Sequence, residues 1–213
     1  MSEVIVYGPP FAPFTEKVRR ALMLKKLEHR IVEPESPEDY RRWNPETGLL
    51  PVADIDGVRV SDSGRILDFL DERYPEPPLV SADGKAAEQQ RSLEAWAEET
   101  FFFYWERYLQ HLVPADGPGP GPLARFGILR RSATRGADRY AEEFAQRIDD
   151  LANFLGGRPF FYADRISRAD LAVHSFVRNL REGVAQRDET KIDRHPSLIE
   201  WFERVEQETS GTE

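Results

Sequence analysis

The feature that most constrains this chain is a proline inside a short apolar run, Gly48-Leu49-Leu50-Pro51-Val52. Proline cannot donate to the hydrogen-bond ladder of a sheet, and peptide bonds before proline are where cis bonds occur, usually in tight turns. We therefore expect a cis bond between Leu50 and Pro51, at a sharp turn that feeds a sheet edge and leaves the backbone groups of Leu50 free. The alternative is a turn proline that only shapes the fold.

The segment after this turn predicts a hairpin followed by a helix. Asp56-Gly57 is a strong two-residue hairpin signal between Val52–Ile55 and Val58–Val60. Ser61-Asp62-Ser63 then supplies N-cap chemistry for a helix that runs to about Tyr74. A free backbone edge beside a helix N-terminus suits a peptide-like ligand, because strand groups can pair with its backbone and the helix start can hold its carboxylate.

The residues before the turn predict a strand–helix–strand unit. Val4–Tyr7 is a continuous apolar run, Pro13 fits the first turn of a helix, and His29–Val32 predicts a second strand. This unit implies a right-handed crossover with parallel pairing. A short helix over 37–43, the hairpin and the next helix complete the βαβαββα order of a thioredoxin-like domain.

On the first helix, helical spacing places Val18, Ala21 and Leu22 on one buried face. The basic residues of the same helix are expected to form a solvated face: Lys17, Arg19, Arg20 and Lys26.

The remainder of the chain predicts an all-helical domain. The proline-rich stretch Tyr74–Pro78 has no regular period, so we divide the chain into a domain over 1–76, a linker over 77–83, helices over 84–208 and a frayed tail over 209–213. A long helix from Leu93 to Leu112 has two apolar faces, and others are expected over 140–155, 171–180 and after Pro196. Ser167 and Asp170 have the spacing of a capping box.

Composition excludes several classes of function. The chain contains no cysteine, so it can form neither disulfides nor a cysteine nucleophile. Its formal net charge of −9 makes nucleic acid a poor partner. The four histidines are far apart, so we expect no metal site. No secretory signal or apolar run of membrane-spanning length is visible, so we expect a cytoplasmic protein without a membrane partner.

Five segments together resemble the glutathione transferase superfamily, and their order and spacing are more specific than any one of them. They are Phe11–Leu22 (FAPFTEKVRRAL), Asn44-Pro45, Gly48–Val52 (GLLPV), Asp62–Leu67 (DSGRIL) and Ser167–Ala172 (SRADLA). The resemblance covers nearly all of the chain. It implies the thioredoxin-like domain and the helical domain, with glutathione as co-substrate.

The resemblance also implies which residues bind glutathione. The residue before the cis-proline, Leu50, would pair its backbone with the cysteinyl part of the tripeptide, beside Pro51. Ser63 would hold the γ-glutamyl carboxylate and Asp62 its ammonium group, although both also fit plain N-capping. Phe14 completes the expected set. The family places a pocket for an apolar co-substrate where this chain has Phe11, Tyr104 and Tyr108, and aromatic residues there are also expected core.

The segment from Phe11 to Thr15 departs from the family pattern. Members with serine or cysteine catalysis carry that residue where this chain has Ala12, which can neither donate a side-chain hydrogen bond nor form a mixed disulfide. Conjugation needs only that the bound thiol ionise, which a helix N-terminus and a nearby hydroxyl promote. The candidates are Thr15 in the first helical turn, Tyr7 at the end of the first strand, and the main-chain N–H groups of Phe14 and Thr15.

Two hypotheses follow. In the first, the protein is an enzyme that activates the thiol of glutathione for attack on a small electrophile or a peroxide. In the second, Ala12 marks a non-catalytic member that binds glutathione or a protein partner. A third reading is an interaction module that binds no glutathione. The resemblance further implies a homodimer, and we expect the second apolar face of the long helix, from Phe101 to Leu112, to contribute to it.

Overall fold

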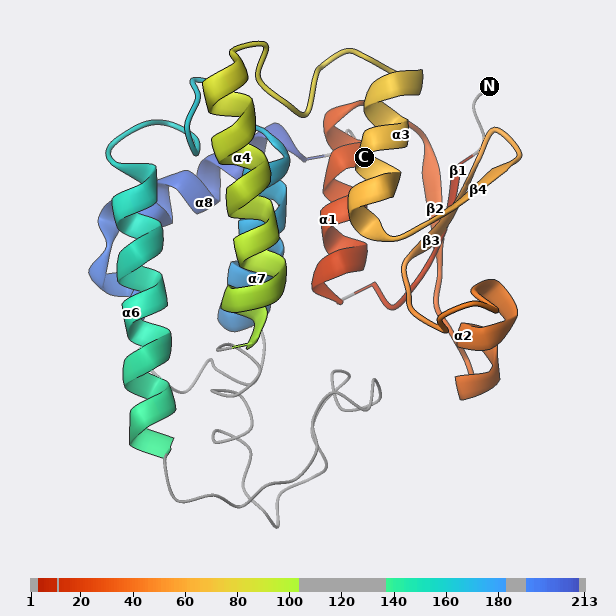
Figure 1. The fold of residues 1–213 in the computed structure, drawn as a ribbon, viewed down its shortest axis with the longest axis horizontal. Helices are drawn as coiled ribbons and strands as arrows, with labels where there is room; N and C mark the ends of the chain where they lie inside the picture. Colours follow the sequence, from red (N-terminus) through yellow and green to blue (C-terminus); the bar gives the residue numbers. More distant parts are fainter. Residues whose placement is uncertain (1–3, 11, 104–136, 183–190, 211–213) are drawn as a thin grey trace.

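The structure is a computed structural model, and it describes residues 4–10, 12–103, 137–182 and 191–210. Figure 1 shows a sheet with flanking helices on one side of the molecule and a group of helices on the other. Two expectations fall on residues outside these ranges. They are the co-substrate pocket residues Phe11, Tyr104 and Tyr108, and most of the second apolar face of the long helix.

The four strands form one mixed sheet in the order β2-β1-β3-β4. Their bounds are β1 Val4–Tyr7, β2 His29–Val32, β3 Val52–Ile55 and β4 Val58–Ser61. β1 pairs in parallel with β2, and the other two pairings are antiparallel. Asp56 and Gly57 both have positive φ, as the predicted two-residue hairpin requires.

Three helices accompany the sheet: α1 Pro13–Leu24, α2 Pro37–Trp43 and α3 Ser63–Arg73. α1 and α3 lie on the side of the sheet that faces the other helices (Figure 1). Their apolar faces form the core with the inward side chains of the sheet, including Val6, Val18, Leu22, Ile55, Leu67 and Leu70. The predicted βαβαββα order is therefore confirmed.

The second part of the chain is helical. Its bounds are α4 Gly84–Trp96, a π-helical turn η1 Ala97–Phe101, α6 Ala137–Leu155, α7 Arg168–Glu182, a 3-10 turn η4 Lys191–Arg194 and α8 Pro196–Glu208. α7 is the central helix, and it packs against α1, α4 and α8. Phe101 was expected on the second apolar face of the long helix, which we assigned to a dimer interface. It is instead fully buried within the chain, where its ring contacts Phe144 and Phe176.

The start of α7 is fixed by Asp170, as the capping box predicted. Its carboxylate accepts hydrogen bonds from Ser167 N and Oγ at 2.9 and 2.8 Å. It also accepts from Phe161 N at 2.9 Å and from the indole N–H of Trp201 at 2.8 Å. This buried carboxylate therefore ties α7 to the preceding loop and to α8.

The expectation that the basic residues of α1 form a solvated face is wrong for two of them. Lys17 is 1% exposed and Arg20 is 2% exposed, whereas Lys26 does face solvent. The reason is that the helical part covers this face of α1, chiefly through α7. The charges are tolerated because each cation meets carboxylates from the other part of the chain.

Two ion-pair networks cross this interface. Lys17 Nζ lies 2.9 Å from Glu94 Oε1 and also contacts Glu98. Arg20 donates to Glu206 and to the hydroxyl of Thr209, both at 2.6 Å. Thr209 is therefore buried and hydrogen-bonded, although we expected it at the start of a frayed tail.

Candidate functional site

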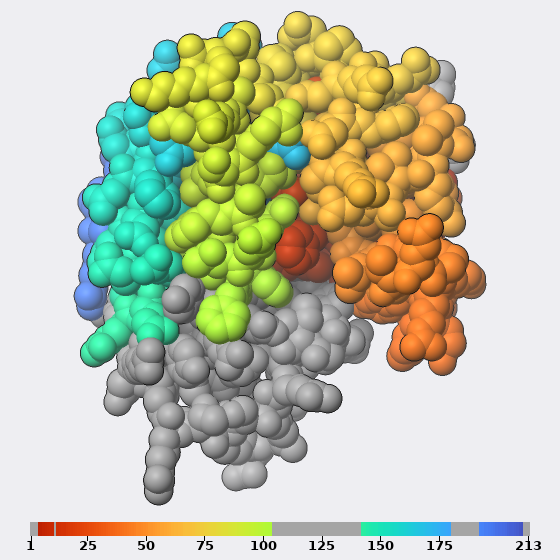
Figure 2. Space-filling model, in the orientation of Figure 1, coloured from red at the N-terminus to blue at the C-terminus, as the bar shows by residue number. Residues whose placement is uncertain are grey.

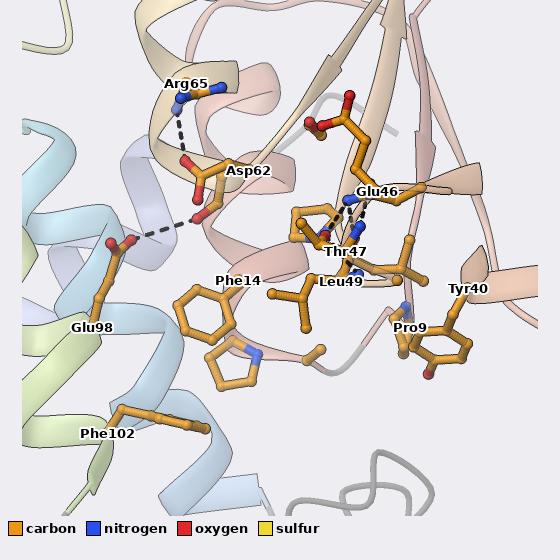
Figure 3. Close-up of a pocket in the computed structure, with 18 residues that line it drawn as sticks. Pro9, Phe14, Tyr40, Glu46, Thr47, Leu49, Asp62, Arg65, Glu98 and Phe102 are labelled. Carbon is orange, nitrogen blue, oxygen red and sulfur yellow. Dashed lines mark hydrogen bonds between the residues drawn. The ribbon is translucent and has the colours of Figure 1, made fainter. Parts of the chain in front are cut away.

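A cavity of about 620 Å³ opens where the two parts of the chain meet. Its wall comes from the start of α1, the end of α2 with the loop after it, the Leu50–Pro51 turn, the start of α3, and η1. In the space-filling view of Figure 2, a small red surface of the N-terminal segment is visible between the yellow-green and the orange parts of the chain. Figure 3 shows the lining residues converging from these elements.

The turn at Pro51 forms one side of the cavity, and the Leu50–Pro51 bond is cis, as predicted. Asn44 holds the loop before it, because its side-chain amide donates to Leu49 O at 2.9 Å and to Thr47 Oγ1 at 2.8 Å. Leu49 is 69% exposed at the cavity mouth. The loop is thus fixed by a side chain, and the turn presents Leu50 to the cavity.

The start of α3 forms a second side. Asp62 is the N-cap residue, and its Oδ1 accepts a hydrogen bond from Arg65 N at 3.0 Å. Ser63 follows it as the first helical residue and is 4% exposed. Because the first N–H groups of an α-helix have no internal partners, this end of the cavity offers donors and a positive helix terminus to an anion.

Glu98 closes the cavity opposite Ser63. It lies on η1, and its Oε1 is 3.5 Å from Ser63 Oγ (Figure 3). Its side chain is 25% exposed and forms an ion pair with Lys17 of α1. Burial raises the pKa of Glu98, the Lys17 ammonium group opposes that shift, and the Glu94 and Asp62 carboxylates add to it.

The sequence analysis did not single out Glu98, and it placed its partner Lys17 on a solvated face. A signal was present, because Glu94 and Glu98 are like charges four residues apart, which is unfavourable on a solvated helix. A cation between the two carboxylates relieves this repulsion, and Lys17 is that cation.

The start of α1 forms the floor. Ala12 is its N-cap residue and makes no side-chain capping bond, and Ala12, Pro13 and Phe14 line the cavity. The N–H groups of Phe14 and Thr15 belong to the first turn, whose donors lack partners within the helix. The helix terminus therefore points into the cavity with no side-chain hydroxyl at Ala12.

The two hydroxyl candidates for thiol activation do not line the cavity. Thr15 is fully buried, and its Oγ1 lies so close to Gly8 that a Cβ there would collide with it. Tyr7 donates to Asp54 Oδ2 at 3.1 Å and packs its ring against Trp43 of α2. Burial and this hydrogen bond raise the pKa of Tyr7.

The apolar part of the cavity wall contains Phe14 and Phe102, whose ring centroids are 5.5 Å apart, together with Leu49. Phe102 immediately follows η1 and occupies the side where we expected aromatic residues of the same long helix. The cavity thus combines a polar end at Ser63 with an apolar face at Phe14 and Phe102.

Comparison with known proteins places these features in a family. The model of the glutathione S-transferase N-terminal domain matches residues 6–78, and the model of the C-terminal domain matches residues 130–210. The chain belongs to the glutathione S-transferase superfamily. It is 23% identical over 237 residues to the isoprene-epoxide–glutathione S-transferase of Rhodococcus sp., covering 95% of this chain and 97% of that one.

Solved structures of similar fold support the same architecture. A glutathione S-transferase of Methylobacterium radiotolerans, in complex with glutathione sulfonate, has a TM-score of 0.73 at 23% identity over 99% of this chain and 96% of its own. FzlA from C. crescentus has a TM-score of 0.77 at 19% identity, covering 96% of this chain and 88% of its own. These likenesses establish the glutathione S-transferase fold for this chain.

No helix in the part of the chain that the structure describes has both the length and the apolar character needed to cross a membrane. Within the same ranges, no group of three or more His, Asp or Glu side chains is placed to hold a metal ion.

Proposed function

We propose that the protein binds glutathione in this cavity and activates its thiol for attack on an electrophile or a peroxide. The observation that carries the proposal is that Leu50, Ser63 and Ala12 open into one cavity of about 620 Å³. Leu50 offers backbone groups to the cysteinyl residue, and the α3 terminus at Ser63 offers donors to the γ-glutamyl carboxylate. Relatives named as glutathione transferases use the same tripeptide, which supports the assignment.

The thiol is then ionised by the α1 terminus. A helix N-terminus lowers the pKa of a nearby thiol, because its unpaired N–H groups and the helix dipole stabilise the thiolate. The N–H groups of Phe14 and Thr15 supply this field, and the positions of Thr15 Oγ1 and Tyr7 make them poor alternatives. With a carbon electrophile, the thiolate forms a bond to the carbon atom, and the leaving group, or the ring oxygen of an epoxide, takes the electron pair. With a peroxide, the thiolate attacks one oxygen, the O–O bond breaks with release of an alcohol or water, and a second glutathione converts the resulting sulfenic acid to the disulfide and water.

The electrophile is expected against the apolar wall made by Phe14 and Phe102, with Leu49 at the mouth. An apolar wall beside a polar anchor is the usual construction of a small-molecule site. The class of electrophile is therefore apolar and small enough to share the cavity with the thiol.

A second function, glutathione binding without catalysis, is favoured by Ala12. Residue 12 provides no hydroxyl or thiol at the helix start. The two candidate hydroxyls do not line the cavity, because that of Thr15 lies against Gly8 and that of Tyr7 donates to Asp54. In this case the cavity would retain its affinity for the tripeptide, but the bound thiol would keep an ordinary pKa.

Conjugation of glutathione to a reactive aryl halide tests both functions. The wild-type protein should accelerate the reaction, and Thr15→Val and Tyr7→Phe should leave the rate nearly unchanged, whereas a lost oxyanion-type donor typically costs about 10²–10³ in rate. A wild type that binds glutathione but gives no acceleration, with a steep gain for Ala12→Ser, would establish the binding function instead. A large loss for Thr15→Val or Tyr7→Phe would refute the helix-terminus account.

We also propose a cytoplasmic homodimer, as the family resemblance implies. Leu49, which is 69% exposed, presents apolar surface to such an interface. Size-exclusion chromatography with light scattering at micromolar concentration should give twice the chain mass of 24.5 kDa. A species of single-chain mass would contradict the dimer.

A further inference from the structure

The two ends of the cavity differ in their exposure to solvent. Ser63 is 4% exposed and the side chain of Glu98 is 25% exposed, so a ligand group between them is largely enclosed. Beyond the Leu50–Pro51 turn, the wall comes from the end of α2 and the following loop, where Glu46 and Thr47 are exposed. Figure 3 shows these two residues on the far side of the cavity from Glu98. A ligand anchored at Ser63 and extended past the turn would therefore end in this open part.

The loop at the open end uses its own hydrogen-bond donors internally. The backbone N–H of Thr47 donates to Asn44 Oδ1 at 3.3 Å, and that of Gly48 donates to Asn44 O at 2.8 Å. The N–H of Leu49 donates to Thr47 Oγ1 at 3.2 Å. The side-chain amide of Asn44 donates to Thr47 Oγ1 and to Leu49 O. Strong binding of a carboxylate requires N–H donors or cations, and these N–H groups already have acceptors.

The charge at the open end is also unfavourable for a carboxylate. Glu46 contributes a carboxylate of its own to this part of the wall. Among the described residues that line the cavity, the one cation is Arg65, and it belongs to the start of α3 instead. Arg41 and Arg42 lie in the last turn of α2 and are not part of the lining, and Arg42 pairs with Asp39 at 2.7 Å. The open end therefore suits a ligand group that is neutral or positively charged.

We infer that the cavity prefers peptide thiols whose C-terminal carboxylate is capped as an amide over glutathione itself, above all when the amide carries an ammonium group that can reach Glu46. This inference rests on the proposed function, since it assumes the cysteinyl residue at Leu50 and the γ-glutamyl carboxylate at Ser63. An amide removes the charge that Glu46 repels, and its substituent can extend into solvent through the open end. Because Glu46 is exposed, water screens both the repulsion and the ion pair, so each effect is modest.

The test compares four ligands of the wild-type protein by isothermal titration calorimetry. They are glutathione, its glycinamide form, its glycine N-butylamide, and its glycine amide with 1,3-diaminopropane, which matches the butylamide in length but ends in an ammonium group. The glycinamide should bind about two- to fivefold tighter than glutathione, the range of a screened charge interaction. A site that held this carboxylate would instead lose about 10- to 100-fold in affinity for the glycinamide. The diaminopropane amide should bind about two- to fivefold tighter than the butylamide.

Two variants then locate the preference. Glu46→Gln should bind the butylamide and the diaminopropane amide with nearly equal affinity, and it should bring glutathione and the glycinamide close to each other. Glu72→Gln is the matched control, because it makes the same change at an exposed carboxylate of α3 that does not line the cavity. This control should keep both wild-type preferences.

A glycinamide that binds no tighter than glutathione to wild type would overturn the inference, as would full preferences retained by Glu46→Gln. If glutathione binds tighter and Arg41→Gln removes that advantage, the carboxylate is held by Arg41 and the inference is wrong. Those results leave glutathione binding intact. If wild type binds none of the four ligands, the proposed function fails and the inference fails with it.

Discussion

Replacement of Lys17 by methionine should lower the free energy of unfolding by about 3–5 kcal/mol, the usual cost of removing one partner of a buried ion pair. Lys17 is 1% exposed, and its Nζ lies 2.9 Å from Glu94, whose side chain is 6% exposed. It also pairs with Glu98. Without the ammonium group, two carboxylates face each other in the interface between α1 and the helical part.

Urea denaturation followed by tryptophan fluorescence measures this change. Lys26→Met is the matched control, because Lys26 follows the same helix but is exposed, and a surface change of this kind should stay within about 0.5 kcal/mol. Addition of Glu98→Gln to Lys17→Met should recover part of the loss by removing one unpaired charge. A loss for Lys17→Met no larger than that of the control would refute the buried network.

Two other predictions concern stability. Asp170→Ala should lower the free energy of unfolding by more than about 4 kcal/mol, because four donors would lose their acceptor and each buried unsatisfied donor costs about 1–3 kcal/mol. Asp164→Ala, at an exposed site, is the control, and similar urea midpoints for the two variants would contradict this account. Burial alone would raise the pKa of Glu206, but the His174 imidazole, whose Nε2 lies 3.0 Å from Oε1, and the hydrogen-bonded Arg20 guanidinium lower it to about 2 from an ordinary 4.5. Its stabilisation is therefore present above pH 4.5 and lost as pH falls toward 2, so the stability difference between wild type and Glu206→Gln should shrink over that window, and a constant difference would contradict this.

Most of the fold and part of the site followed from local signals in the sequence. The proline within Leu49–Val52, the Asp56-Gly57 pair and the Ser167–Asp170 capping box each depend on chemistry within a few residues. Each of them therefore predicted its turn or helix start correctly. Local signals also singled out Leu50, Pro51, Asp62 and Ser63, and the structure brings these four residues together in the wall of one cavity.

What the sequence did not reveal depends on contacts between distant segments. Lys17 and Arg20 were expected to be solvated, because their carboxylate partners, Glu94 and Glu206, come from helices far along the chain. The direction of a side chain was also not predictable at Thr15 and Tyr7. Helix rotation turns the Thr15 hydroxyl toward Gly8, and strand alternation turns Tyr7 toward Trp43.

The binding of glutathione to the wild-type protein and to Ser63→Ala tests the central claim most directly. Calorimetry should show that wild type binds the tripeptide and that Ser63→Ala weakens binding by about 1.5–3 kcal/mol, the value of a hydrogen bond to a charged group. The free energy of unfolding should fall by less, because Asp62 still caps α3. No heat of binding and no thermal shift at millimolar glutathione would contradict the account, since a ligand at about 100 times its dissociation constant stabilises a protein by about 2.7 kcal/mol. An unchanged affinity of Ser63→Ala with a clear loss of stability would reduce Ser63 to a helix cap.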